Sequence, residues 1–144
     1  MIHHAWTAIC QHSSIDKDTN NISFNVFEQL TIRIPPFSPD TPGIIFPAQI
    51  EIISLWYRDK NSAGMKGKGR VRIEAPHQKE VRMIDIDIDL VAYHRHRTRV
   101  RLDGLPIPKD VSGYFYFIMS LETDHQWVDV ARIPLEVNVE HTLP

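Results

Sequence analysis

Apolar and polar residues alternate along most of this chain, and no window shows a sustained helical period. The clearest alternation covers residues 22–34, where apolar side chains fall on one face and polar ones on the other. Residues 35–43 include four prolines, which cannot donate to a β-ladder, so we expect a crossover loop between sheets there. Alternation predicts about eight strands, at residues 4–11, 22–34, 48–57, 70–75, 81–91, 95–102, 114–121 and 127–139.

Short strands separated by turn signals predict an all-β fold, a two-layer antiparallel β-sandwich that forms one domain over residues 1–144. A chain of 144 residues, 42% of them apolar, can bury a core without disulfides. The single cysteine, Cys10, excludes an intrachain disulfide and favours a reducing compartment. Residues 5–10 are too short an apolar stretch for a signal peptide or a membrane span, so we expect a cytoplasmic protein with no membrane contact.

Residues 81–102 contain no Gly or Pro, yet a single strand of that length would be exceptional. A hairpin with a short loop at residues 92–94 resolves this and places three carboxylates opposite three guanidinium groups. The expected pairs are Asp85 with Arg101, Asp87 with Arg99, and Asp89 with Arg97. A shift of one residue would mix the charged and apolar faces, so the pattern favours this register.

Two resemblances to known families are visible in the chain. The stretch from Asp110 to Tyr116 resembles the corner before strand F of immunoglobulin-like sandwiches, with Tyr116 where a disulfide cysteine would stand, and Trp56 lies about where their core tryptophan is expected. The whole chain is similar to a family of short, uncharacterised bacterial proteins, through residues 5–10, 15–23, 55–58 and 104–108. That resemblance supports the fold and implies no activity, cofactor or site.

Several constellations could bind ions, and each has a simpler interpretation. Asp16-x-Asp18-x-Asn20 opens like a calcium loop, but its sixth and twelfth positions lack the glycine and glutamate of an EF-hand, so a solvated turn is favoured. His94-x-His96 could present two imidazoles to a metal, yet a structural zinc site needs four ligands. We therefore expect no metal and no cofactor.

Other candidates concern phosphate binding and catalysis. The segment 64–69, Gly-Met-Lys-Gly-Lys-Gly, is interpreted as a flexible hairpin loop, although residues 66–72 with Arg58 and Lys60 form the most basic stretch and could contact a polyanion weakly. Cys10-x-His12 has the spacing of a thiolate and a base, but no third residue is apparent. Glu28 falls on the apolar face of its strand. Either it is buried with a raised pKa, as in a catalytic acid, or a β-bulge near Phe27 turns it outward, which we favour.

Three predicted strands are apolar on both faces: residues 48–57, 114–121 and 127–139. In an immunoglobulin-like order they share a sheet, and an antiparallel sheet normally leaves one face polar for water. We therefore expect Tyr116, Ile118, Val128 and Val130 to form an apolar patch for a homo-oligomer or a protein partner, unless the loop 34–47 covers it.

The function expected from the sequence is a non-enzymatic binding or assembly module with no catalytic residues. The alternatives are a metal- or ligand-dependent enzyme with its site on the loops, and a weak polyanion-binding module. With a net charge of −2 and a pI near 6.4, no global basic field attracts nucleic acid, which is therefore an unexpected partner.

Overall fold

The computed structural model describes residues 1–26 and 28–142, and confirms an all-β class. Besides one 3-10 turn, Pro76–Gln78, these residues form eleven strands rather than about eight. No described helix is long and apolar enough to cross a membrane. The strands are β1 His3–Ile15, β2 Ile22–Val26, β3 Gln29–Ile34, β4 Gly43–Phe46, β5 Ile50–Tyr57, β6 Met65–Ala75, β7 Lys79–Leu90, β8 Arg95–Leu102, β9 Leu105–Pro108, β10 Gly113–Thr123 and β11 Gln126–His141.

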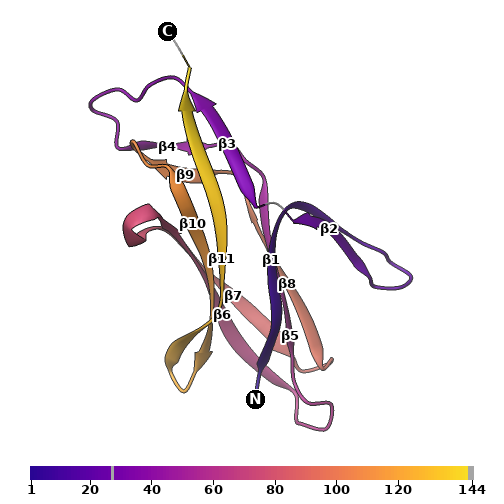
Figure 1. Cartoon of the computed structure of the whole chain (residues 1–144). Helices are drawn as coiled ribbons and strands as arrows, with labels where there is room; N and C mark the ends of the chain where they lie inside the picture. The colour runs from indigo at the N-terminus through magenta and orange to yellow at the C-terminus, as the bar shows by residue number, and fades with distance from the viewer. Residues whose placement is uncertain (27, 143–144) are drawn as a thin grey trace.

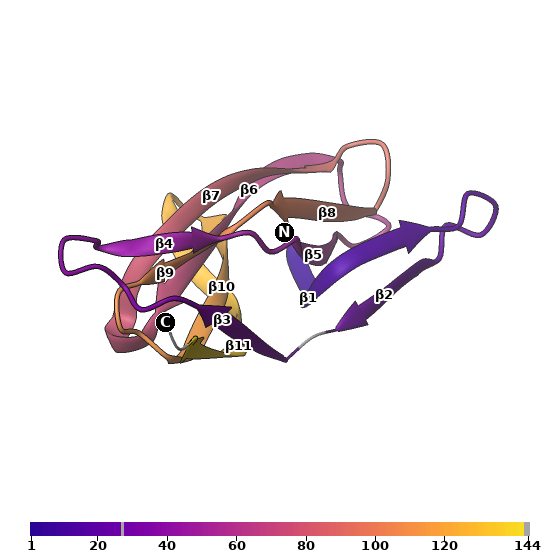
Figure 2. The same ribbon diagram turned by 90° about the horizontal axis from the view of Figure 1, so that it is seen from above.

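The strands form three sheets, named A, B and C here (Figure 1). Sheet A has the order β2-β1-β5-β8, sheet B the order β3-β11-β10-β6-β7, and sheet C contains β4 and β9. Seen from above, sheet B curls into a half-barrel (Figure 2). In both views the β1–β2 hairpin extends away from the rest of the molecule.

One hydrophobic core unites residues from sheets A, B and C. Its largest fully buried side chains are Trp56, Phe115 and Phe117. The indole Nε1 of Trp56 donates to Thr98 Oγ1 at 2.9 Å, which satisfies the buried N–H. Because burying one large apolar side chain stabilises by roughly 1.5–3 kcal/mol, the core decides which face of β5 and β8 points inward.

Residues 22–34, predicted as one strand, form two strands in different sheets. β2 pairs with β1 in sheet A, whereas β3 runs parallel to β11 at the edge of sheet B. Glu28 lies between them and is exposed, and its carbonyl oxygen accepts the N–H of Glu136 at 3.0 Å. Phe27, the other half of the predicted bulge, lies outside the described residues. The alternation continues through this crossover because Ile22, Phe24, Leu30 and Ile32 are all at least partly covered.

Residues 35–42 form no strand, as their prolines predict, and a short strand follows directly after them. Gly43–Phe46 forms β4, which pairs with β9, and the N–H of Lys109 donates to the carbonyl of Pro42 at 2.8 Å. Prolines alternate along β9, where their missing N–H groups restrict it to a short ribbon. The sequence did not predict sheet C, because prolines argue against strands.

The predicted ladder between the aspartates of β7 and the arginines of β8 is wrong. β7 pairs with β6, so that Asp85 lies opposite Arg70 and Asp89 opposite Lys66, and β8 pairs with β5. The turn at residues 91–94 takes the chain from sheet B to sheet A instead of closing a hairpin. Basic residues alternate on both β6 and β8, so charge complementarity did not distinguish the two pairings.

The three two-sided strands do not share a sheet, which corrects a second prediction. β5 belongs to sheet A, while β10 and β11 are neighbours in sheet B. β5 is an inner strand of sheet A, flanked by β1 and β8. On the face away from the core, Ile53 lies opposite Arg99 in the register, and Ile53 is fully buried.

Candidate functional site

The predicted partner-binding residues are only partly brought together. Tyr116 and Ile118 lie on the outer face of sheet B, where the guanidinium of Arg132 stacks over the Tyr116 ring at 3.9 Å. Ile118 is 2% exposed, so it offers little surface to a partner. Val128 lies near the β10–β11 turn on the other face of the sheet, half exposed, and Val130 packs against the core. A patch containing all four stays a prediction that this geometry does not favour.

The candidate ion-binding residues serve local structure. Asp16 Oδ1 accepts the backbone N–H groups of Asp18 at 2.8 Å and Thr19 at 3.1 Å. The N–H of Thr19, then that of Asp18, lowers the pKa of the Asp16 carboxyl. His96 Nδ1 accepts the N–H of Asp89 at 2.9 Å. Within residues 1–26 and 28–142, no group of three or more His, Cys, Asp or Glu side chains could hold a metal ion.

Cys10 is fully buried, and burial raises the pKa of its thiol, with the negative charge of Glu51 acting in the same direction. A buried, protonated thiol is a poor nucleophile. The pair Cys10 and His12 therefore has no support as a catalytic arrangement.

The basic stretch at residues 66–72 lies on a strand, which corrects the predicted loop. β6 begins at Met65, and a Cβ at Gly67 or Gly69 would meet the side chain of Ile2 or Ile86. Three of its four charges are paired within the chain, and Lys68 has no ion pair among the described residues. Lys66 meets Asp89 at 3.7 Å, Arg70 binds Asp85 at 2.6 Å, and Arg72 binds Asp129 at 2.9 Å. Little of this charge is left for a polyanion.

A second basic surface lies on β8. Its sequence, Arg-His-Arg-Thr-Arg-Val-Arg-Leu, places four arginines on one face and His96, Thr98, Val100 and Leu102 on the other. The second set faces the core, because Thr98, Val100 and Leu102 are buried. Arg95, Arg97, Arg99 and Arg101 therefore point to the outer side of sheet A, and we call this surface the arginine face.

Aromatic and apolar side chains accompany these arginines across the sheet. The register places Tyr57 opposite Arg95 and Leu55 opposite Arg97 on β5, and Trp6 of β1 opposite Leu55. His3 stacks on Tyr57 with ring centroids 4.9 Å apart, and Trp6 stacks on Phe24 of β2 at 5.8 Å. One end of the arginine face is thus bordered by aromatic rings.

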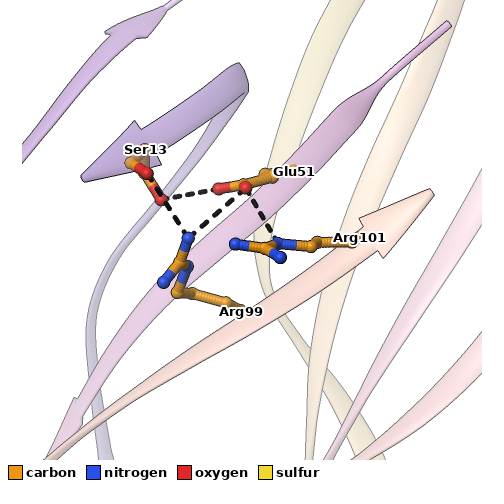
Figure 3. Close-up of polar contacts among 4 residues, drawn as sticks. All are labelled: Ser13, Glu51, Arg99 and Arg101. Carbon is orange, nitrogen blue, oxygen red and sulfur yellow. Dashed lines mark hydrogen bonds and ion pairs between the residues drawn. The ribbon is translucent and has the colours of Figure 1, made fainter. Parts of the chain in front are cut away.

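At the other end, one buried carboxylate binds two of the arginines (Figure 3). Glu51 accepts a hydrogen bond from Ser13 Oγ at 2.6 Å and contacts Arg101 Nε at 3.0 Å and Arg99 Nη2 at 3.4 Å. Desolvation alone would raise the pKa of Glu51, but the Ser13 hydrogen bond and the two guanidinium groups outweigh it and lower that pKa. Glu51 is therefore ionised at neutral pH.

Arg95 and Arg97 have no such partner. Among the described residues neither has a carboxylate oxygen within 4.0 Å, and Arg97 Nη2 donates only to the carbonyl of Asn20, at 3.2 Å. The Nε atoms of Arg97 and Arg99 are buried without a described hydrogen-bond partner. Four arginines against one carboxylate leave three positive charges unbalanced on this face, in a chain whose net charge is −2.

A groove runs beside the unpaired arginines. It has a volume of about 820 Å³ and lies between the β1–β2 turn and β8. Trp6 and Leu55 provide its apolar lining, Arg95 and Arg97 its positive charge, and Asn20 its polar rim. Figure 2 shows the tip of the β1–β2 hairpin extending beyond the ends of β5 and β8. The groove can hold a ligand that combines negative charge with some apolar surface.

The sequence contains only some of the signals for this surface. The alternation of arginines on β8 is visible in the sequence, but it predicts that they pair with the aspartates of β7 and not with Glu51. Glu51 interrupts the otherwise apolar run Ile50–Ile53, and such an isolated carboxylate is a signal for a buried ion pair. Trp6 has no comparable signal, because its position beside Leu55 depends on the pairing of β1 with β5.

Neither a scan against models of known protein families nor a search of curated proteins finds a match to this chain. The interpretation of the arginine face therefore rests on its geometry and charge.

Proposed function

We propose that this protein is a non-enzymatic binding module that holds an anionic partner on the arginine face of sheet A. The observation that supports this most is the unbalanced charge of β8, where Arg95 and Arg97 lack carboxylate partners among the described residues. Guanidinium groups bind carboxylates and phosphates through planar, often bidentate hydrogen bonds, and they remain charged at any physiological pH.

The chemistry of this surface supports binding rather than catalysis. A general acid or base needs a pKa near the working pH, whereas the lowered pKa of Glu51 keeps it an ionised anchor for Arg99 and Arg101. Arginine does not exchange protons in this range. An enzyme with its site on the loops is the alternative, but Asp16 and His96, two of its candidate residues, are engaged in local hydrogen bonds.

Three finer expectations accompany this proposal. An immunoglobulin-like sandwich is supported by Trp56, which lies on β5 in the centre of the core as that resemblance implies. Self-association is supported by the aromatic surface at Tyr114 and Tyr116, whose rings lie 6.4 Å apart on β10. Cytoplasmic localisation stays an expectation that accords with the buried, unbridged Cys10.

The test is a fluorescence anisotropy titration with two labelled anions, a short polyglutamate peptide and an oligothymidylate. We expect at least one to bind at low ionic strength and to dissociate as salt is added. The double variant Arg95→Glu and Arg97→Glu should lose this binding. Arg82→Glu is the matched control, because Arg82 is exposed on β7 with no ion pair among the described residues. Failure of both anions to bind wild-type protein contradicts the proposal.

A further inference from the structure

The arginine face has a repeat that a particular kind of ligand would match. Its arginines occur at every second residue of a strand, so their Cα atoms are spaced by about 6.6–6.8 Å along β8. An extended polypeptide with acidic residues at every second position has the same spacing and places all its carboxylates on one side. Such a segment could meet several arginines at once without bending.

β8 is also the last strand of its sheet. It pairs with β5 on one side, and none of its main-chain groups bonds to another described element on the other side. An edge strand can accept an added strand from a partner, with main-chain hydrogen bonds giving affinity and alternate side chains giving specificity. The edge and the arginine repeat therefore belong to the same strand.

The molecule already contains the contacts that such an added strand would make. On the opposite side of β8, Glu51 lies directly across from Arg101 and binds it at 3.0 Å. In sheet B, Asp85 lies across from Arg70 and binds it with two hydrogen bonds, at 2.6 and 3.1 Å. An acidic residue on a neighbouring strand thus meets an arginine at the paired position in both sheets.

The remaining charge of the molecule favours a protein over a nucleic acid. The chain has 16 basic and 18 acidic residues, and four of the basic ones are gathered on β8. The rest of the surface is acidic on balance, so a long polyanion that extended beyond β8 would be repelled. A domain that binds nucleic acid usually has a basic surface and a pI above about 9, and this chain has a pI of about 6.4.

We infer that the partner is an acidic, extended protein segment that adds to sheet A alongside β8, with carboxylates at alternate positions paired to Arg95, Arg97 and Arg99. This inference rests on the proposed function and specifies its ligand.

The experiment compares labelled peptides against the full chain by anisotropy. One peptide alternates Glu with Ser, a second has the same composition with its glutamates contiguous, and oligothymidylate is the third ligand. We expect the alternating peptide to bind about tenfold tighter than the contiguous one, because all of its glutamates lie on one face, whereas half of those in a contiguous run point away from the arginines. Equal affinity of the two peptides, or tighter binding of oligothymidylate, overturns the inference while the proposed function stands. If no anion binds, both fail.

A second comparison tests strand addition itself. Two versions of the alternating peptide are N-methylated at every second backbone amide. One phase carries the methyl groups on the amides of the Glu residues and the other on those of the Ser residues. In an added strand only one set of amides faces β8, so one phase should abolish binding and the other should retain it. Equal effects of the two phases contradict addition at this edge. The single variant Arg95→Glu, at an exposed position, should weaken binding of the alternating peptide several-fold. An unchanged circular dichroism spectrum checks that the variant is folded.

Discussion

Replacing Glu51 with glutamine removes the negative charge that pairs with Arg99 and Arg101 on the arginine face. The Glu51 side chain is 7% exposed and accepts from Ser13 at 2.6 Å and from Arg101 at 3.0 Å. Hydrogen bonds to charged groups contribute about 1.5–3 kcal/mol each. The contribution of Arg101 is smaller because its side chain is 67% exposed and water screens it. We therefore expect Glu51→Gln to lower the free energy of unfolding by about 1–3 kcal/mol, measured by urea denaturation at neutral pH.

The effect has a defined pH dependence. The lowered pKa of Glu51 means that the folded protein holds this proton less tightly than the unfolded chain. The stabilisation is fully present above about pH 4.3, the ordinary pKa of glutamate, and is lost as the pH falls through the lower folded pKa. The stability difference between wild type and Glu51→Gln should therefore shrink as the solution is acidified.

Glu140→Gln is the matched control for this variant. Glu140 pairs with Arg33 at 3.1 Å, but both side chains are largely exposed, so the pair should contribute less than about 1 kcal/mol. The reasoning is refuted if Glu51→Gln costs no more than Glu140→Gln, or if its cost is the same at neutral and acidic pH.

Three further predictions address the other candidate residues. If Tyr116 lies in a self-association surface, Tyr116→Glu should convert an oligomer to a monomer in sedimentation, and a wild-type protein that is monomeric at high concentration contradicts that surface. A chelator should leave the thermal midpoint unchanged, since Asp16 and His96 are engaged in local hydrogen bonds, and a fall in the midpoint would show a bound structural metal. Cys10 should react with a thiol reagent only when the protein unfolds, and rapid labelling of the native protein is the opposing result.

The strand pattern of this protein was accessible from its sequence because alternation is a local property. Most expected strands exist, and the even-numbered residues of β5 and β8 face the core as the alternation indicates. The sheet to which each strand belongs could not be predicted from the sequence, since it depends on pairing with strands that are distant along the chain. Asp85 could pair equally well with Arg101 or with Arg70, and the choice was made by the crossover at residues 91–94.

The candidate site depended on the same long-range choice. Once the aspartates of β7 pair with β6, the arginines of β8 are left with Glu51, which lies outside the segment that suggested the ladder. Their proximity to Ser13 and Trp6 follows from the pairing of β1 with β5, across more than forty residues of sequence. The apolar patch was overestimated because Ile118 is buried and is flanked in the register by Arg72 and Arg132.

The most direct test of the arginine face as a binding surface is nuclear magnetic resonance mapping of the backbone amides during a titration with the alternating Glu-Ser peptide. We expect salt-sensitive shift changes confined to β8, β5 and the β1–β2 turn, with the largest at Arg95 and Arg97. Shift changes centred on Tyr116 and the outer face of sheet B, or no change at low ionic strength, would contradict binding at the arginine face.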